Sequence, residues 1–336
     1  MRPLLLALFA LGLSACSAEP DLVVYCALDE GFSEPLLRRF EKETGLDVEV
    51  QFDTEASKTV GLVRALIEEA KNPRCDVFWN NEIAQTVRLA EAGMLEPYDS
   101  PSAANIPEQF RDPDRRWTGF AARARIFIVN TDLVDPSELK GMADLLDPKW
   151  KTRVGMARPL TGTTLTHATA LFDALGEEDA IAHLTAIRDG GASGDINIGT
   201  SNGQVMRLVR EGTLAWGWTD TDDYNVAREE GFPVAAVYPD QGEGELGTLV
   251  IPNTICIPKG APHQANAQRL VDWVLREEIE RELAHSRSAQ IPVRDSVERP
   301  EHVRLLGEIR AMQVSFVSLG KQMERRSQDL AELFLQ

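Results

Sequence analysis

Several polar segments of this chain follow apolar, strand-like runs, where side chains are well placed to meet a ligand. The most acidic of them, residues 220–224, follows the apolar run 214–218 and contains Asp220, Asp222 and Asp223. Three carboxylates so close together repel one another unless a cation or hydrogen-bond donors compensate them. Two acids suffice to stabilise a helix start, so the third indicates either a hard cation with oxygen ligands or the amine of an organic ligand.

Two acids from the first third of the chain extend this group. Asp29 follows the apolar run 22–26, and Glu82 follows the run 76–79. Ligands of open α/β sheets bind outside the carboxyl ends of the strands, so these residues are expected to share one rim. The predicted metal ligands are Asp29, Glu82, Asp220, Asp222, Asp223 and Tyr224.

A second group of residues has the chemistry of an anion site. Small hydroxyl residues and glycine open two predicted helices, one after residue 160 and one at 201–203. The free N–H groups and positive dipole of a helix start attract anions, and an arginine adds a fork of donors. The plain alternative is that these side chains only cap their helices. The predicted ligand-binding residues are Asn81, Arg123, Arg125, Thr161, Gly162, Thr163 and Asn202.

The elements that must position these residues alternate between strands and helices. The first part of the chain predicts strands at 22–26, 48–52 and 76–79 and helices at 34–44, 57–70 and 82–92. This alternation indicates a parallel sheet covered on both faces. A strand at 125–130 then leads into a second α/β lobe, with strands at 154–156, 214–218 and 234–238 and helices at 179–188 and 202–210.

The end of the chain is predicted to return to the first lobe through the strand-like run 248–257. Helical patterns follow at 263–276, at 279–284 and over most of 301–334. The predicted fold class is therefore α/β, with two lobes that each contain a mixed, mostly parallel sheet flanked by helices, joined by hinge crossings that suit closure on a ligand. We assign residues 22–122 and 250–295 to lobe 1, 123–249 to lobe 2 and 296–336 to a C-terminal helical segment.

The amino terminus has the layout of a secretory signal. Arg2 precedes the apolar run 4–13, which is too short to span a bilayer, and Leu13-Ser14-Ala15-Cys16 forms a lipobox. We predict a signal peptide at 1–15, a lipid on Cys16 and a tether at 16–21. The protein is then periplasmic or on the cell surface and is held to a bacterial membrane through that lipid only.

Charge and cysteine content exclude several other classes of protein. The net charge of −18 argues against a nucleic-acid partner. Cys26, Cys75 and Cys256 are odd in number and lie in or beside apolar runs. They predict small buried side chains rather than a disulfide framework or a zinc site.

Several segments, in their order and spacing, point to one family. They are the run 22–26, 40–45 (FEKETG), 75–79 (CDVFW), 93–97 (GMLEP), 123–125 (RAR), 147–151 (DPKWK), 159–163, 209–212 (VREG) and 227–231 (AREEG). From about residue 22 to about residue 315 the chain resembles the periplasmic ferric-iron-binding proteins of ABC importers. The resemblance implies the type II periplasmic-binding-protein fold. It also implies a monomer without cofactor that captures a small ligand between its lobes, closes on it and docks on a membrane permease.

The resemblance is less complete at the ligand. Ferric binders of this family hold iron with paired tyrosines at the positions of Thr221 and Asp222, and their first-lobe histidine and glutamate fall near Asp29 and at Asn81. The residues that hold an accompanying anion in relatives match better, at Thr161, Gly162, Thr163, Asn202 and one of Arg123 or Arg125.

Two interpretations of the ligand therefore stay open. One is ferric iron held by the carboxylate set, with a synergistic anion beside it; the acidic oxygen groups that dominate the predicted rim favour it. The other is an organic anion or zwitterion, such as an aminophosphonate or a phosphorylated small molecule.

An enzyme is the remote alternative. Residues 220–224 partly resemble the DxDx[T/V] motif of haloacid-dehalogenase-like phosphatases, in which the first aspartate attacks phosphorus. The late position of the motif, Tyr224 at its last place and the complete lobe before it count against this interpretation. We expect no enzymatic activity.

Overall fold

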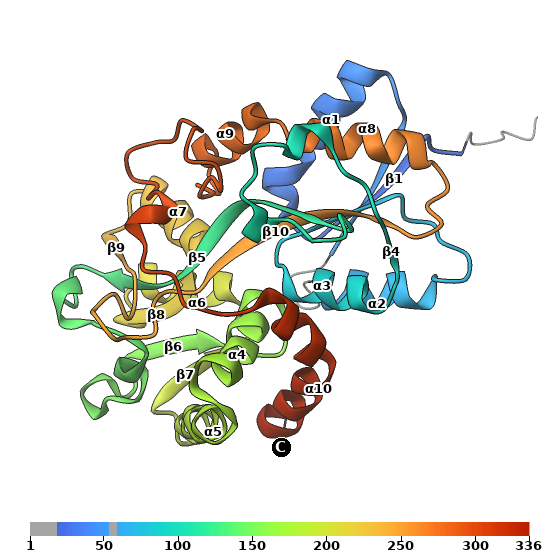
Figure 1. Cartoon of the computed structure of the whole chain (residues 1–336). Coiled ribbons are helices and arrows are strands. Elements are labelled where there is room, and N and C mark those ends of the chain that lie inside the picture. The colour runs from blue at the N-terminus through green and yellow to red at the C-terminus, as the bar shows by residue number, and fades with distance from the viewer. Residues whose placement is uncertain (1–18, 54–58, 336) are drawn as a thin grey trace, which may run out of the picture.

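A computed structural model describes residues 19–53 and 59–335 of the chain (Figure 1). The predicted signal peptide, Cys16 and the first residues of the helix predicted at 57–70 lie outside the described residues. The rest of the chain forms two α/β lobes that share a continuous mixed sheet with the strand order β2-β1-β3-β10-β5-β8-β6-β7.

The first lobe is built on three short parallel strands, β1 (Leu22–Cys26), β2 (Val48–Phe52) and β3 (Val77–Asn80). β10 (Val250–Pro258) lies antiparallel to β3 and brings the end of the chain back to this lobe, and β4 (Leu95–Glu96) pairs with its far end. Continuous apolar runs form the central strands because helices cover both faces. Those helices are α1 (Glu30–Thr44), α2 (Val60–Glu68), α3 (Ala84–Glu91), α8 (Gln264–Val274) and α9 (Glu277–His285).

The first crossing between the lobes is the long strand β5 (Thr118–Asn130), which starts seven residues earlier than the predicted strand at 125–130. Its first half pairs with β10 up to Ala124, opposite Val250. From Arg125, opposite Asp220, it pairs with β8 of the second lobe. β5 and β10 thus form the hinge, and the change of partner falls between two adjacent residues.

The second lobe repeats the α/β pattern. Its parallel strands are β6 (Val154–Ala157), β7 (Ile196–Gly199) and β8 (Trp216–Asp220), and β9 (Val234–Val237) pairs antiparallel with β5. β8 ends two residues later than predicted, so Asp220 is the last residue of the strand. The helices are α4 (Gly162–Leu175), α5 (Glu177–Ser193), α6 (Asn202–Arg210) and α7 (Thr221–Glu229).

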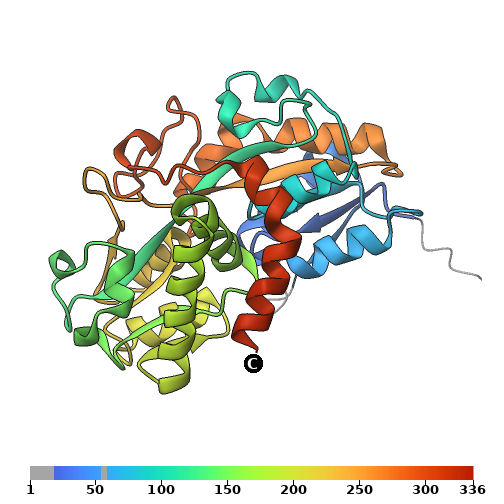
Figure 2. The same ribbon diagram turned by 60° about the horizontal axis from the view of Figure 1, so that its bottom comes forward.

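The C-terminal segment differs from its prediction. Residues 301–315 are not a continuous helix but contain only the short 3-10 turn Leu306–Glu308, and α10 covers Phe316–Phe334. Figures 1 and 2 show α10 lying between the helices of the two lobes. It packs on α3 of the first lobe and on α4 of the second. The remaining 3-10 turns lie in connections, at Pro101–Ala103, Glu108–Phe110, Pro136–Glu138, Met142–Leu146 and Pro148–Trp150.

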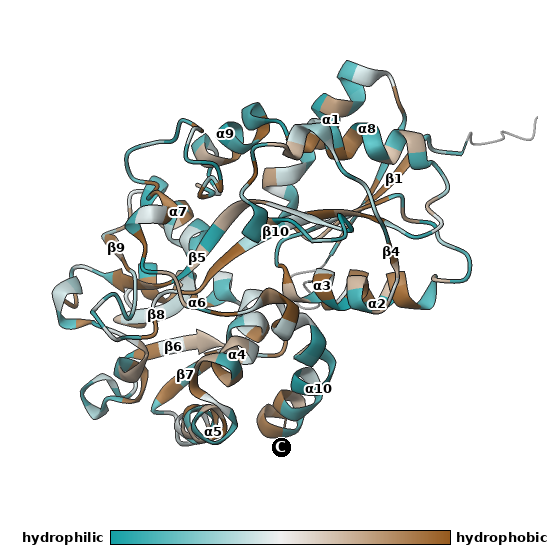
Figure 3. Cartoon of the chain, in the orientation of Figure 1, coloured by the Kyte–Doolittle hydropathy of each residue, from teal (hydrophilic) through white to brown (hydrophobic). Residues whose placement is uncertain are grey.

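The apolar residues concentrate on the strands and on the inner faces of the helices, whose outer faces are hydrophilic (Figure 3). Cys26, Cys75 and Cys256 are buried free thiols, and burial raises the pKa of each. Across residues 19–53 and 59–335, no helix has both the length and the apolar character needed to cross a membrane.

Candidate functional site

A cavity of about 240 Å³ lies between the two lobes. Asp29, at the N-terminus of α1, and Asn81, after β3, line it from the first lobe. The second lobe contributes the N-terminal ends of α4 and α6 and the junction of β8 with α7. The carboxyl ends of strands from both lobes therefore meet at one site, as the rule for open α/β sheets predicts.

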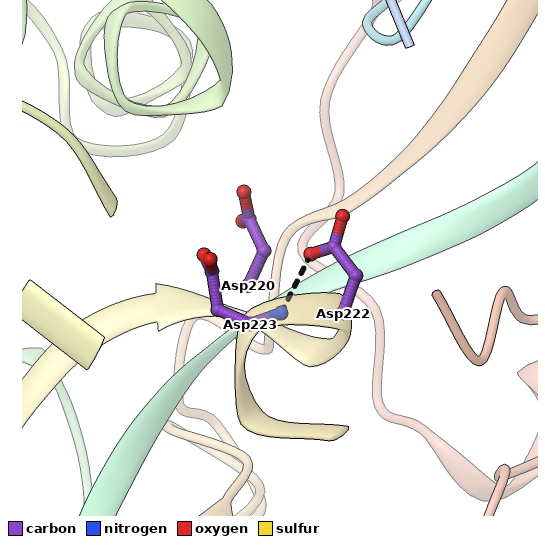
Figure 4. A group of neighbouring side chains, drawn as sticks. All are labelled: Asp220, Asp222 and Asp223. Carbon is purple, nitrogen blue, oxygen red and sulfur yellow. Dashed lines mark hydrogen bonds between the residues drawn. The ribbon is translucent and has the colours of Figure 1, made fainter. Parts of the chain in front are cut away.

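The acidic cluster forms one wall of this cavity. A carboxylate oxygen of Asp220, of Asp222 and of Asp223 all lie within 4.8 Å of one another. Figure 4 shows the three carboxylates on the same side of the β8–α7 junction, with the N–H of Asp223 donating to Asp222 Oδ1 at 3.1 Å. Asp222 and Asp223 lie in the first turn of α7, where the helix dipole favours negative charge.

Asp220 accepts hydrogen bonds from three side chains, which come from β5 and from the starts of α4 and α6. Arg125 Nη1 donates to Asp220 Oδ1 at 2.8 Å in a pair whose side chains are 1% and 5% exposed. Thr163 Oγ1 and Asn202 Nδ2 donate to Asp220 Oδ2 at 2.5 and 2.9 Å. Asp220 thereby ties the start of α4 and the start of α6 to the end of β8. A phosphatase nucleophile would need this carboxylate to be available to a substrate, so the geometry gives the phosphatase alternative no support.

Arg123 is the predicted arginine that lines the cavity, whereas Arg125 lies behind it, paired with Asp220. Arg123 is 2% exposed and stands on β5 just before the change of strand partner. Its Nη1 lies 3.5 Å from Asp222 Oδ2, and its Nη2 donates to Asn253 Oδ1 of β10 at 3.0 Å. The Nε of Arg123 has no acceptor among the described residues. One buried guanidinium thus connects both hinge strands with the acidic wall.

Two helix N-termini supply the other wall. Gly162 begins α4 with φ of 56°, a left-handed value that glycine adopts without strain, and the side chain of Thr161 makes no cap hydrogen bond. Ser201 caps α6 by accepting from the N–H of Gln204 at 3.2 Å, as the plain alternative expected. The first N–H groups of each helix lack partners within the helix, so two positive helix ends converge on the cavity. Sequence reasoning missed a further basic residue here, Arg207 on α6, which also lines the cavity.

Two predicted metal ligands lie outside the cavity lining. The buried carboxylate of Glu82 accepts from Asn80 Nδ2, from the N–H groups of Ala84 and Gln85, and from Thr166 Oγ1 of the other lobe. Burial raises the pKa of this carboxyl against the effect of those donors. Glu82 therefore caps α3 and joins the lobes.

Tyr224 also lies outside the cavity lining, although it directly follows Asp223 in α7. It lines a separate small cavity with Tyr238, and burial raises the pKa of its phenol. No tyrosine is among the described residues that line the 240 Å³ cavity.

Comparison with known proteins agrees with this architecture. The family described as bacterial extracellular solute-binding protein matches residues 36–306. The chain belongs to this family. Among solved structures, iron-bound HitA from Pseudomonas aeruginosa superimposes with a TM-score of 0.81 and 23% identity, over 92% of this chain and 98% of that one. This likeness confirms the two-lobe α/β fold predicted from the sequence.

Sequence relatives of this solute-binding protein are named for different ligands. Iron uptake protein A1 of Synechocystis sp. is 26% identical, over 92% of this chain and 89% of that protein. A putative 2-aminoethylphosphonate-binding periplasmic protein of Salmonella typhimurium is also 26% identical, over 88% and 86%. The predicted resemblance to ferric-iron-binding proteins and the predicted solute-binding role are both confirmed.

Proposed function

We propose that this solute-binding protein captures ferric iron together with a small anion outside the cytoplasm and delivers both to the permease of an ABC importer. The observation that carries the proposal is the composition of the cavity, in which an acidic wall faces two helix N-termini. Ferric iron is a hard cation, so carboxylate oxygens suit it as ligands. The helix ends and Arg123 suit the anion that completes its coordination.

The proposed metal ligands are Asp29, Asp222 and Asp223, which line the cavity. Asp220 is left out because Arg125, Thr163 and Asn202 occupy it. The proposed anion-binding groups are Arg123 and the first residues of α4 and α6, with Asn81 on the opposite lobe. Ligand contacts to both lobes favour the closed form, and the permease then distinguishes the loaded protein from the empty one.

The lipid on Cys16 would keep the protein at the membrane that holds this permease. No catalytic step is part of the proposal. The protein acts through affinity and shape alone.

A zwitterionic organic ligand, such as an aminophosphonate, is the second candidate. The absence of tyrosine from the described cavity lining favours it, since phenolates are the hard anionic donors with which the ferric binders of this fold hold iron. An amine would take the place of iron at Asp222 and Asp223, and a phosphonate would take the place of the anion at the helix ends.

The test is equilibrium dialysis of the purified protein against radioactive ferric iron with bicarbonate, and against 2-aminoethylphosphonate. In the double variant Asp222→Asn, Asp223→Asn we expect affinity for ferric iron to fall by about a hundredfold or more, since two anionic ligands of a trivalent ion are lost. The matched control is Glu178→Gln, Asp179→Asn, which removes two exposed acids from the first turn of α5, outside the cavity.

The control should bind iron within about twofold of the wild type, because its charges are screened by solvent. Binding of 2-aminoethylphosphonate without binding of iron would replace the first candidate by the second. Iron binding that survives in the double variant would remove the acidic wall from the site.

A further inference from the structure

Arg207 is the basic residue at the cavity that the function proposed above leaves unused. It lies on α6, five residues after Asn202, or about 7.5 Å along the helix axis at 1.5 Å per residue. Helical side chains lean toward the N-terminus of their helix, so Arg207 projects back over the end of α6 that faces the cavity. It lines the cavity but is exposed, which places it at the cavity mouth.

The guanidinium of Arg207 makes no hydrogen bond or ion pair with any other residue that the structure describes. Arg210, one turn further along α6, shows the contrast. It is paired with Glu230 and lies with its guanidinium carbon 4.8 Å from the ring centroid of Phe232. Two arginines on one helix therefore have different surroundings: Arg210 is held by its own protein, and Arg207 presents its donors at the cavity.

The size of the cavity sets the kind of anion that can use those donors. A volume of about 240 Å³ far exceeds the roughly 10–15 Å³ that a cavity needs in order to hold one water molecule. A ferric ion with a single small anion such as bicarbonate would fill only part of it. A small organic anion fills more of the space and extends from the helix ends toward the mouth.

The basic groups also lie at two depths. Arg123 is 2% exposed and sits against Asp222, beside the hinge. Arg207 is exposed and shares the cavity lining with the first residues of α4 and α6. An anion with one charged group can be held at the helix ends, but only an anion with a second charged group can also reach Arg207.

We propose that Arg207 is a specificity-determining residue that binds the outer charged group of a polyanionic organic ligand. This inference rests on the proposed function, because it takes the ferric ion to enter with its anion. It narrows that anion to small organic molecules with two or more anionic groups, in preference to bicarbonate. Arginine suits this role because its planar fork donates two parallel hydrogen bonds to a carboxylate or a phosphate.

The experiment compares wild type, Arg207→Gln and the matched control Arg210→Gln by equilibrium dialysis at physiological salt. Each protein is measured with ferric citrate and with ferric iron plus bicarbonate. In Arg207→Gln we expect affinity for ferric citrate to fall about fivefold to thirtyfold, the range of one charge-assisted contact at a partly exposed site. Affinity with bicarbonate should change less than about twofold, and Arg210→Gln should change neither affinity by more than that.

Arg207→Lys separates recognition from a structural role. Lysine retains the charge but not the fork, so it should restore only part of the affinity for ferric citrate. The urea midpoints of Arg207→Gln and Arg207→Lys should stay at the wild-type value. Equal losses with both anions, or equal behaviour of Arg207→Gln and Arg210→Gln, would overturn the inference and leave the iron proposal standing. A wild-type protein that binds neither iron complex would overturn both.

Discussion

Asp220→Asn is the substitution that best tests whether Asp220 has a structural role, in contrast to the ligand-binding role proposed for Asp222 and Asp223. The change keeps the volume of the side chain, so no cavity forms, but it removes the negative partner of Arg125. That pair is almost completely buried, with side-chain exposures of 1% and 5%. Removing one member of a buried ion pair costs about 3–5 kcal/mol, because the other charge is left without compensation.

Asparagine cannot replace the three hydrogen bonds either. Asp220 accepts from Arg125, Thr163 and Asn202, whereas the amide of asparagine has one oxygen and would direct its NH₂ group at donors. We therefore expect the free energy of unfolding of the ligand-free protein, measured by urea titration, to fall by about 3–5 kcal/mol. Against a typical total of about 5–15 kcal/mol, this is a severe loss.

Asp223→Asn is the matched control, with the same change of charge three residues away. Asp223 is only half-buried, accepts from Thr219 and stands in the first turn of α7. Loss of its favourable dipole interaction should cost about 1 kcal/mol or less, while iron affinity falls. The structural role would be refuted if Asp220→Asn lowered the free energy of unfolding no more than Asp223→Asn does and yet abolished iron binding. Asp220 would then be a ligand contact.

Two further substitutions test the packing around the site. His167→Phe keeps a ring against Trp218, 4.4 Å away between centroids, and removes two ring nitrogens that have no partner among the described residues. Burial lowers the pKa of His167 well below its ordinary value, so wild-type stability is lost as the pH falls below about 6.5, where the unfolded histidine takes up a proton. The variant should gain about 1 kcal/mol at pH 7.5 and more at pH 5.5, and lower stability than wild type at pH 5.5 in urea titrations would contradict this. Met323→Ala should lower the free energy of unfolding by about 2–5 kcal/mol in the same measurement, because Met323 is 0% exposed where α10 meets α4. Met323→Leu, which nearly keeps the volume, should lower it by less than about 1.5 kcal/mol. Equal losses in the two variants would show that side-chain volume at this position does not matter.

Much of the fold was predictable because the central strands are buried on both faces and appear as continuous apolar runs. The strands at 22–26 and 48–52 have the predicted bounds, and the alternation of strands and helices gave both lobes. Residues 301–315 were wrongly predicted as helical because apolar spacing alone does not show what the chain packs against. There the chain runs beside the hinge, where Thr248 donates to the carbonyl of Arg310 at 2.8 Å and Met312 donates to that of Thr248 at 2.9 Å.

The composition of the site was predictable in part. Residues at strand ends and helix starts could be selected from the pattern. Ten of the thirteen predicted ligand residues line the cavity, and one of them, Asp220, also ties its walls together. The pattern could not show that Glu82 accepts from Thr166, 84 positions away, or that Arg125 neutralises Asp220 from 95 positions away. Such pairings are fixed by the tertiary fold, and they decide whether a carboxylate is available to a ligand.

In the proposed function, the acidic cluster would serve both ends of the ligand through different members. Asp220 holds Thr163 and Asn202, and with them the two helix starts that form the anion end. Asp222 and Asp223 are the second and third residues of α7 and line the cavity, where they would form the cation end. A change of ligand can then be accommodated at the half-buried Asp223 at little cost to the fold. A change at Asp222 leaves the buried Arg123 without its acidic partner, and any change at Asp220 disturbs the buried network and the anion end together. This division gives a physical reason why one fold can hold either a metal with its anion or an organic zwitterion with the same helix N-termini.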